Sequence, residues 1–308
     1  MSKQAWVFPG QGSQFLGMLS DLASEFPTVE NTFAAASEVL QYDLWDVVNN
    51  DEVKLGQTQV TQPALLAASY AIFQVLKENN MPLPVYMAGH SLGEYSALVC
   101  AGVIDFKDAI KLVEARGQFM QEAVPQGVGA MYAIIGLEDE KVIASCEQAQ
   151  VDSNMVVAAV NFNSPGQVVI AGNKEAAERA AELCKEQGAK RALPLPVSVP
   201  SHCALMKPAA DKLSVLLNDI DFTAPQIPVI NNVDVEMESD PEAIKKALIA
   251  QLYSPVRWTE TVNQLHQLGV DNLYEIGPGK VLTGLTKRIN KALTCKAIGS
   301  LESVSDLN

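Results

Sequence analysis

The chain has 308 residues, of which 48% are hydrophobic and 19% charged, so it is long and apolar enough to bury an extensive core. Its formal net charge of −14 argues against a broad nucleic-acid-binding face or attraction to an anionic membrane. The five cysteines include no CxxC pair, which argues against a zinc site or a disulfide framework and favours a reducing compartment. No apolar run reaches the roughly 20 residues of a membrane span, and residues 1–8 carry no signal-peptide pattern. We therefore expect a cytoplasmic protein that binds neither nucleic acid nor a membrane.

Strand patterns alternate with helical patterns along the first part of the chain, which predicts an α/β domain. Within residues 62–77 the apolar side chains recur at helical spacing and share one face. The elements expected here are a strand at 5–8, a glycine-rich turn, a helix from about Phe15, a helix at 62–77, a strand at 85–88 and helices at 95–103 and 105–122.

Residues 128–197 have a different pattern, strand-helix-strand-strand-helix-strand, which is the ferredoxin-like arrangement. We infer a small domain at 128–197 inserted into a larger α/β domain made of residues 1–127 and 198–308. Prolines mark its edges at Pro125 and at Pro194, Pro196 and Pro200. Its strands are expected at 129–136, 155–160, 168–171 and 191–197, with helices at 138–150 and 174–187. The larger domain then resumes with a helix at 207–217, strands at 228–233 and 272–276, a helix that ends at Asn290 and frayed residues at 300–308.

Residues 85–94 predict a nucleophile elbow, in which a serine lies on a tight turn between a strand and a helix. Gly89 and Gly93 flank Ser91 two residues away on either side, where larger side chains would collide with the strand or helix. The turn also directs the backbone N–H of Leu92 toward an oxyanion formed on Ser91. The alternative is a glycine-flanked helix start with Ser91 as the N-cap.

A serine nucleophile needs a base, and the chain has three histidines. His90 directly precedes Ser91 and should point elsewhere, and His266 lies in a polar helical segment. His202 lies in a loop between two apolar segments, so by elimination it is the candidate base, although a lone loop histidine is also a common surface residue. Cys203 is a rival nucleophile, but a buried apolar role suits it better. No carboxylate is an evident partner for His202, so a backbone carbonyl or an amide could orient it, and we favour a dyad over a triad.

Arg116 is a charged residue on an otherwise apolar helical stripe, three and four residues from Val113 and Leu112. A buried guanidinium needs an anionic partner. The partner could be a structural Glu or Asp, or it could be a substrate carboxylate held by the two prongs of the guanidinium. The sequence leaves both alternatives open.

Residues 9–14, Pro-Gly-Gln-Gly-Ser-Gln, follow the first strand and resemble a phosphate-binding turn. The third glycine of a dinucleotide motif would fall at Phe15, and no Gly-Lys-Ser/Thr follows, so nucleotide binding is disfavoured. Gly10 and Gly12 instead suit a bare backbone close to a ligand, where the N–H of Gln11 could be a second oxyanion donor.

Taken together, five motifs resemble a known family. In their order and spacing they are similar to the bacterial malonyl-CoA:acyl carrier protein transacylases of fatty-acid synthesis and, more widely, to the acyltransferase domains of polyketide synthases. The resemblance extends from about Ala5 to Ile289. The motifs are Phe8-Pro-Gly-Gln-Gly-Ser-Gln14, Gly89-His-Ser-Leu-Gly-Glu94, Arg116, Asn161-Phe-Asn-Ser-Pro165 and Pro200-Ser-His202.

This resemblance implies a hydrolase-like parallel-sheet core with a ferredoxin-like insert. It also implies ping-pong transfer of a malonyl group from malonyl-CoA, through an ester on Ser91, to the phosphopantetheine thiol of an acyl carrier protein. No metal or redox cofactor is expected, and the protein is expected to be a monomer. The implied site residues are Ser91 as nucleophile, His202 as base, Gln251 to orient His202, the N–H groups of Gln11 and Leu92 as oxyanion hole, Arg116 for the malonyl carboxylate, and Asn161 and Gln62 in the lining.

A carrier protein is expected to be acidic, as this chain is, so docking would need a local basic patch. The docking candidates are Lys190, Arg191, Lys280, Lys287, Arg288 and Lys291. These residues could equally be a solvated face.

Three alternative functions remain. Many malonyl-specific polyketide domains have Phe immediately before the base, where this chain has Ser201, so an acyltransferase for another extender unit is one alternative. The others are a serine thioesterase or hydrolase of acyl-CoA and a non-catalytic carrier-binding module.

Overall fold

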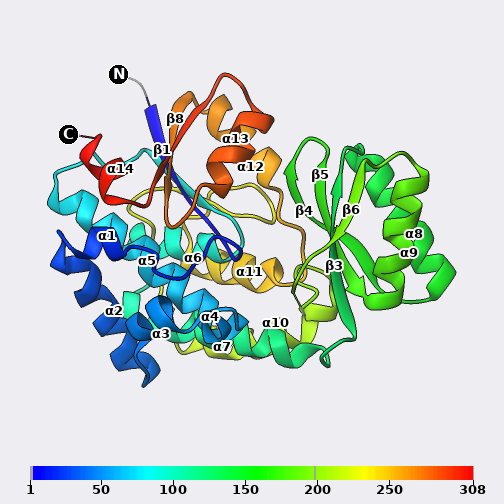
Figure 1. Cartoon of the computed structure of the whole chain (residues 1–308), viewed down its shortest axis with the longest axis horizontal. Helices are drawn as coiled ribbons and strands as arrows, with labels where there is room; N and C mark the ends of the chain where they lie inside the picture. Colours follow the sequence, from blue (N-terminus) through cyan, green and yellow to red (C-terminus); the bar gives the residue numbers. More distant parts are fainter. Residues whose placement is uncertain (1–2, 198, 308) are drawn as a thin grey trace.

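The computed structural model describes residues 3–197 and 199–307 and contains two separate sheets (Figure 1). The larger sheet is parallel, in the order β7-β2-β1-β8-β9, and its central strand β1 is buried from Ala5 to Phe8. Such continuous burial is typical of a parallel strand with both faces covered. Its strands are β1 (Lys3–Phe8), β2 (Tyr86–Gly89), β7 (Val229–Ile230), β8 (Val270–Ile276) and β9 (Thr294–Ile298).

Helices cover both faces of this sheet. Because successive side chains of a strand point to opposite faces, β1 sends Trp6 and Phe8 into one hydrophobic core and Ala5 and Val7 into another. The first core is packed with residues of α2, α5, α6 and α7, and the second with residues of α12 and α13. The helices around this sheet are α1 (Ser20–Ala23), α2 (Pro27–Leu40), α3 (Leu44–Asn50), α4 (Glu52–Leu55), α5 (Thr58–Glu78), α6 (Leu92–Cys100), α7 (Phe106–Ala123), α10 (Lys207–Asn218), α11 (Pro241–Gln251), α12 (Trp258–Gln267), α13 (Val281–Ile289) and α14 (Leu301–Ser305), with a 3₁₀ turn at Ala204–Met206.

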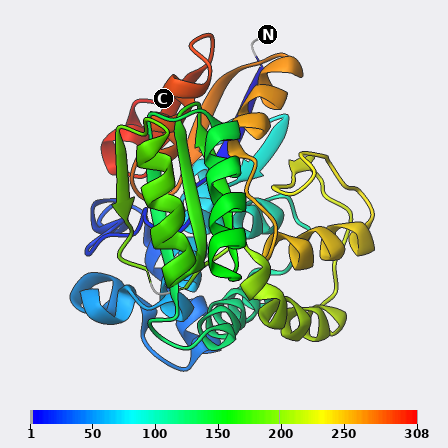
Figure 2. The same ribbon diagram turned by 90° about the vertical axis from the view of Figure 1, so that its right-hand side faces the viewer.

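The smaller sheet is antiparallel, in the order β4-β5-β3-β6, and it carries two helices on one face (Figure 2). This is the predicted ferredoxin-like order. Its other face contributes Met131, Val160 and Val169 to a further apolar cluster, which Cys203 joins from the loop that follows β6. Its elements are β3 (Gly129–Ile135), α8 (Asp139–Ser153), β4 (Val157–Ser164), β5 (Gln167–Asn173), α9 (Lys174–Glu186) and β6 (Arg191–Pro194).

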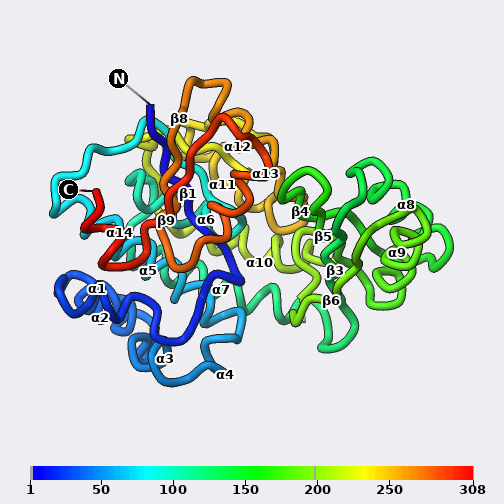
Figure 3. Tube along the Cα trace, turned by 45° about the horizontal axis from the view of Figure 1, so that its top comes forward, coloured from blue at the N-terminus to red at the C-terminus, as the bar shows by residue number. Residues whose placement is uncertain are grey.

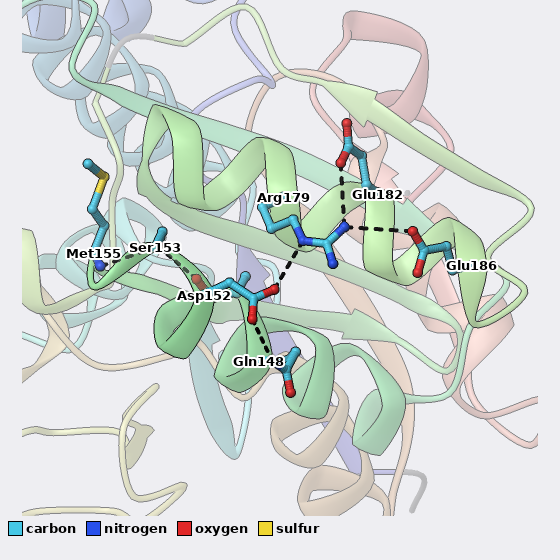
Figure 4. A network of polar contacts seen from close by, with 8 residues as sticks. Gln148, Asp152, Ser153, Met155, Arg179, Glu182 and Glu186 are labelled. Atoms are coloured by element: carbon cyan, nitrogen blue, oxygen red, sulfur yellow. Dashed lines mark hydrogen bonds and ion pairs between the residues drawn. The ribbon is translucent and has the colours of Figure 1, made fainter.

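Polar contacts link α8 and α9 on their exposed side (Figure 4). The Arg179 Nε lies 3.1 Å from an oxygen of Asp152, and the same guanidinium is within ion-pair distance of Glu182 and Glu186. Solvent screens these groups, so the apolar core beneath the helices contributes more to their packing.

The parallel register positions the loops that matter for function. Phe8 at the end of β1 pairs with Gly89 at the end of β2, so the loops that follow both strands meet at the same edge of the sheet. In open α/β sheets ligands bind at this carboxyl-terminal edge. Figure 3 shows both chain termini on the side of the molecule away from the small sheet. In residues 3–197 and 199–307, no helix combines the length and hydrophobicity that crossing a bilayer requires.

Two predicted elements are wrong. No helix starts at Phe15, because the chain turns through Gly17 and Leu19, with φ of 77° and 66°, and α1 begins only at Ser20. Most of 300–308 is also ordered: Ser300 caps α14, and the N–H of Leu301 donates to Asp21 Oδ2 at 2.7 Å. The helix expected at 95–103 begins earlier, at Leu92.

The division into domains at 127/128 and 197/198 remains a prediction. Residues 1–2, 198 and 308, which belong to the predicted ranges, lie outside the described residues.

Candidate active site

Ser91 lies between β2 and α6 in a strained backbone conformation, with φ 52° and ψ −109°. A Cβ atom added to Gly89 would lie 1.9 Å from the carbonyl carbon of Gly93, and one added to Gly93 would lie 2.0 Å from the oxygen of Phe8. Only glycine fits at both positions, as the elbow pattern predicts. Ser91 occupies the N-cap position of α6, but its side chain makes no capping hydrogen bond. The Ser91 hydroxyl contacts His202 and Arg116 instead.

The Ser91 Oγ is 2.8 Å from His202 Nε2, across 111 residues of sequence. On the other side of the ring, His202 Nδ1 is 2.7 Å from the backbone oxygen of Gln251. A carbonyl oxygen can only accept, so Nδ1 carries the hydrogen and the lone pair of Nε2 faces Ser91. Burial, assisted by the charge of Arg116, lowers the pKa of His202 to about 3, which keeps the imidazole neutral and able to accept a proton.

No carboxylate contacts His202 among the described residues, and the group that orients it is the main chain of Gln251. The Gln251 side chain points elsewhere. Its amide nitrogen donates to Glu94 Oε2 at 2.9 Å and to the backbone oxygen of Ser91 at 3.1 Å. The structure therefore places the backbone oxygen of Gln251 against His202, and the orienting role of Gln251 remains a prediction.

Arg116 is buried beside the serine, with 1% of its surface exposed. Its guanidinium donates to Gln62 Oε1 at 2.8 Å, to Gln251 Oε1 at 2.9 Å and to Ser91 Oγ at 3.3 Å, and it lies over the Tyr95 ring. All of these acceptors are neutral. Within the described part of the chain Arg116 forms no ion pair with a carboxylate, so the structural ion pair considered as an alternative is absent.

Leu92 and Gln11 carry the two backbone N–H groups that are predicted to form the oxyanion hole. Leu92 is the first residue of α6, and Gln11 lies in the loop after β1; both line the same cavity as Ser91. In the described residues neither N–H donates to a protein acceptor, so both are available to an oxyanion.

The cavity has a volume of about 570 Å³ and lies between the two sheets. The larger unit lines it with Gln11, Gln62, His90, Ser91, Arg116 and His202, and the smaller sheet and its following loop with Met131, Asn161, Asn163, Val169, Leu195 and Val197. Every predicted catalytic or substrate-binding residue except Gln251 lines this cavity, and Gln251 lies directly behind Arg116 and His202. No group of three or more potential ligands for a metal ion occurs in the residues described.

Two residues that contact the site, Glu94 and Asn232, are not among those predicted from the sequence. Glu94 is 2% exposed, and its Oε2 accepts from the N–H of Asn232 at 2.9 Å as well as from Gln251. Asn232 in turn accepts from the N–H of Ser91 at 2.7 Å and donates to the oxygen of Gly89 at 2.7 Å. A carboxylate inside the apolar helix that begins at Leu92 was the available signal for Glu94, whereas nothing local distinguishes Asn232.

The two pairs of basic candidates lie at the same end of the small sheet. Arg191 pairs with Ile135, which pairs on its other side with Gln167, and Arg288 of α13 donates to Gln167 Oε1 at 2.6 Å. Two strand spacings, roughly 10 Å, therefore separate Arg191 from Gln167, the residue that Arg288 contacts. Lys190 and Lys287 adjoin Arg191 and Arg288 in sequence.

The fold and the site define a class of α/β proteins. In this class a serine lies on a nucleophile elbow, a histidine contacts its hydroxyl, and a buried arginine lies beside the serine. A family model described as "Acyl transferase domain" matches residues 5–304, and the chain belongs to this family. It is 62% identical over 299 residues to the malonyl CoA-acyl carrier protein transacylase of Escherichia coli K12, covering 97% of this chain and 96% of that protein. The Bacillus subtilis protein of the same name is 47% identical over 305 residues, covering 99% and 96%.

Solved structures agree with this fold over the whole chain. An acyl carrier protein S-malonyltransferase from Vibrio cholerae has a TM-score of 0.97 and 65% identity, with 100% of both chains covered. A malonyl-transacylase in complex with its type II PKS acyl-carrier protein has a TM-score of 0.98 and 62% identity, with 99% of both chains covered.

Proposed function

We propose that this protein transfers a malonyl group from malonyl-CoA to the phosphopantetheine thiol of an acyl carrier protein, and so supplies malonyl-ACP for fatty-acid elongation. The observation that carries the proposal is the convergence of Ser91, His202 and Arg116 on one cavity, where the Ser91 hydroxyl faces His202 Nε2 and accepts a hydrogen bond from Arg116. The names of relatives that are 60% and 62% identical over nearly the whole chain support the substrate and the acceptor.

In the first half-reaction, His202 Nε2 removes the proton of Ser91 Oγ as this oxygen attacks the thioester carbonyl carbon. The N–H groups of Gln11 and Leu92 stabilise the resulting oxyanion, and a donor of this kind typically contributes ~3 kcal/mol. Collapse of the intermediate breaks the carbon–sulfur bond. The CoA sulfur leaves with the proton from His202, and malonyl-Ser91 remains.

The second half-reaction reverses these steps with a different thiol. His202 accepts the proton of the pantetheine thiol, the sulfur attacks the ester carbonyl, and Ser91 leaves as an alcohol with the proton returned by His202. CoA must depart before the carrier enters, so the kinetics are ping-pong. Exchange of a thioester for an ester and back changes no oxidation state, and we propose that no metal or redox cofactor takes part.

Arg116 selects the substrate in this scheme. Its guanidinium is buried, donates only to neutral acceptors among the residues that the structure describes, and lies beside the nucleophile. A buried cation of this kind favours a ligand that brings its own carboxylate. Malonyl-CoA has such a group at a fixed distance from the reacting carbonyl, and acetyl-CoA does not.

The carrier would dock on the basic end of the small sheet formed by Lys190, Arg191, Lys287 and Arg288, because a local positive patch is what an acidic partner requires on an acidic protein. We propose that the protein acts in the cytoplasm as a monomer.

Intact-protein mass spectrometry after brief mixing with malonyl-CoA tests the proposal. The expected result is one malonyl adduct that maps to Ser91, is absent from Ser91→Ala and is discharged rapidly by a holo acyl carrier protein but slowly by water. Equal discharge with and without the carrier would indicate a thioesterase. Preferential loading from another acyl-CoA would indicate a different extender unit, and the absence of any adduct would contradict acyl transfer.

A further inference from the structure

Glu94 is a buried carboxylate for which the proposed reaction has no use. It follows Ser91 by three residues, in the first turn of α6, where every residue from Leu92 to Cys100 is buried. A carboxylate in such a place is costly unless its hydrogen bonds are arranged for it. Its partners therefore indicate what it does.

One oxygen of Glu94 holds two groups at once. The Oε2 accepts from the backbone N–H of Asn232 and from the side-chain amide of Gln251, each at 2.9 Å. Both partners come from other parts of the chain, Asn232 from the loop after β7 and Gln251 from the end of α11. Glu94 therefore links the start of α6 to two neighbouring segments.

These two partners form hydrogen bonds with backbone groups of the Ser91 turn. Asn232 Oδ1 accepts from the N–H of Ser91 at 2.7 Å, and its Nδ2 donates to the oxygen of Gly89 at 2.7 Å. Gln251 Nε2 donates to the backbone oxygen of Ser91 at 3.1 Å. A backbone with φ of 52° at a non-glycine residue persists only where its surroundings hold it, and these contacts do so.

Gln251 also connects Glu94 to Arg116. A carboxylate can only accept, so it fixes which end of the Gln251 amide is nitrogen, and the Oε1 of that amide then faces Arg116 at 2.9 Å. The amide lies between a negative and a positive group, in the orientation that both charges favour. With a neutral group at position 94 the amide loses the charged acceptor of its NH₂ group, and only the donor Arg116 and the carbonyl oxygen of Ser91 still favour this orientation.

We propose that Glu94 is a positioning residue of the transfer reaction: its ionised carboxylate orients Gln251 and Asn232, and through them it holds the Ser91 turn and the Arg116 guanidinium for a carboxylate-bearing substrate. This inference rests on the proposed function.

The titration of Glu94 gives the proposal a measurable consequence. Burial raises the pKa of Glu94 to about 7, against the hydrogen bonds from Gln251 and Asn232 and the charge of Arg116, which lower it; Asp234 raises it further. Tyr95 on the same helix has its own pKa raised to about 12 and is neutral at this pH. His202, beyond Gln251, has a pKa of about 3 and does not titrate near neutrality. Loading of Ser91 should therefore increase as the pH rises through about 7, because Glu94 ionises.

The test is rapid-quench measurement of malonyl loading on Ser91 at saturating malonyl-CoA, from about pH 5.5 to about pH 8.5, for the parent and for Glu94→Gln. The glutamine keeps the shape and an acceptor oxygen and removes the charge. We expect it to reduce the loading rate at the upper end of this range about tenfold and to abolish the rise near pH 7. Glu275→Gln is the matched control, a second buried carboxylate that lies on β8; its profile should keep the parent's shape.

A purely structural role of Glu94 would scale the profile without changing its shape, and that result, or parent-like rates in Glu94→Gln, would overturn the inference. If Glu94→Gln does not fold, Glu94→Asp is measured instead. The increase of its loading rate with pH should persist but occur at a different pH, and an increase at the parent's pH would refute the role of Glu94. A parent that forms no malonyl-Ser91 adduct would instead refute the proposed function itself.

Discussion

At the scale of single residues, the reactivity of the site depends on what each polar atom faces. His202 has a backbone carbonyl at Nδ1 and the serine hydroxyl at Nε2, so its tautomer is set without a carboxylate. Among the described residues Arg116 donates only to amide and hydroxyl acceptors, so its charge remains available to a ligand. A buried neutral imidazole beside a guanidinium that no carboxylate contacts directly is an arrangement suited to an anionic acyl group.

Replacing Arg116 by alanine tests the selection of a carboxylate. The kcat/KM for malonyl-CoA should decrease by about two orders of magnitude, because a buried charge-assisted contact is worth about 2–5 kcal/mol. Loading from acetyl-CoA, which has no free carboxylate, should change far less. Steady-state kinetics with both thioesters measures the two changes in kcat/KM. Arg116→Lys is a further variant, which keeps the positive charge but cannot form the two parallel hydrogen bonds of a guanidinium. Equal losses for the two substrates would contradict the assignment.

The buried neutral His202 also makes stability depend on pH. Its pKa in the folded protein is about 3, below the ordinary 6.5, so the unfolded chain takes up a proton first as the pH falls. The stability that depends on a neutral His202 is therefore complete above 6.5 and is lost as the pH falls from 6.5 toward 3. Between pH 7 and pH 5 the loss should be about 2 kcal/mol.

Urea unfolding of the parent and of His202→Gln at both pH values checks this expectation. The glutamine cannot titrate, so the difference in unfolding free energy should shift in its favour at pH 5. His266→Gln, which changes a histidine on α12, is the control. A constant difference between parent and His202→Gln would show that His202 is not held neutral.

At the scale of elements, short contacts and caps hold the helices that present functional groups. The β2–α6 turn depends on the two glycines that flank Ser91, where no Cβ can be accommodated. Helix α13, which carries Lys287 and Arg288, has no side-chain cap from its own N-cap residue. The buried Glu275 of β8 caps it instead, accepting from the N–H of Leu282 at 3.0 Å and from the N–H and hydroxyl of Thr283 at 2.7 Å each.

Glu275→Ala should therefore destabilise the protein by about 2 kcal/mol, because it leaves buried helix N–H groups without an acceptor. Thr283→Ala removes only the hydroxyl contact and should cost about half as much. Thermal or urea unfolding of both variants measures the difference. A smaller effect for Glu275→Ala than for Thr283→Ala would be incompatible with a capping role.

At the scale of the whole molecule, the reaction chamber exists only because the small sheet faces the edge of the large one. Residues of both units line the cavity, and an exposed hydrogen bond from Arg288 to Gln167 links α13 to β5. The same contact brings the basic candidates to one end of the small sheet. A carrier that docks there would lie beside the unit that contributes Met131, Asn161 and Val169 to the cavity.

Reversing Lys287 and Arg288 to Glu should raise the KM for the holo carrier about tenfold and leave the KM for malonyl-CoA unchanged. Lys111→Glu with Lys246→Glu, on the exposed faces of α7 and α11, changes the net charge equally and is the control. Equal effects on both substrates, or the same effect in the control, would exclude this patch as the docking site.

Several features could be predicted because they depend on neighbours along the chain. The elbow at Ser91, the helical stripe that contains Arg116 and the order of strands and helices in 128–197 are local patterns governed by backbone sterics and periodicity. His202 could be chosen only because the chain has so few histidines. The prediction of a helix from Phe15 was wrong because Gly17 and Leu19 have left-handed backbone conformations, which the apolar pattern does not indicate.

The remainder depended on contacts between distant segments. The packing of α6, α7, α11 and the loop after β7 decides these contacts. It places the Gln251 carbonyl against His202 and Asn232 against the nucleophile turn, with Glu94 behind it. It also leaves Arg116 without a contacting carboxylate among the described residues. Ser91 and His202 are 111 residues apart, and their 2.8 Å contact exists only once both sheets are assembled. Residue types and spacings indicate which groups can react, whereas the packing of the tertiary structure decides which atoms meet and which charges stay unpaired.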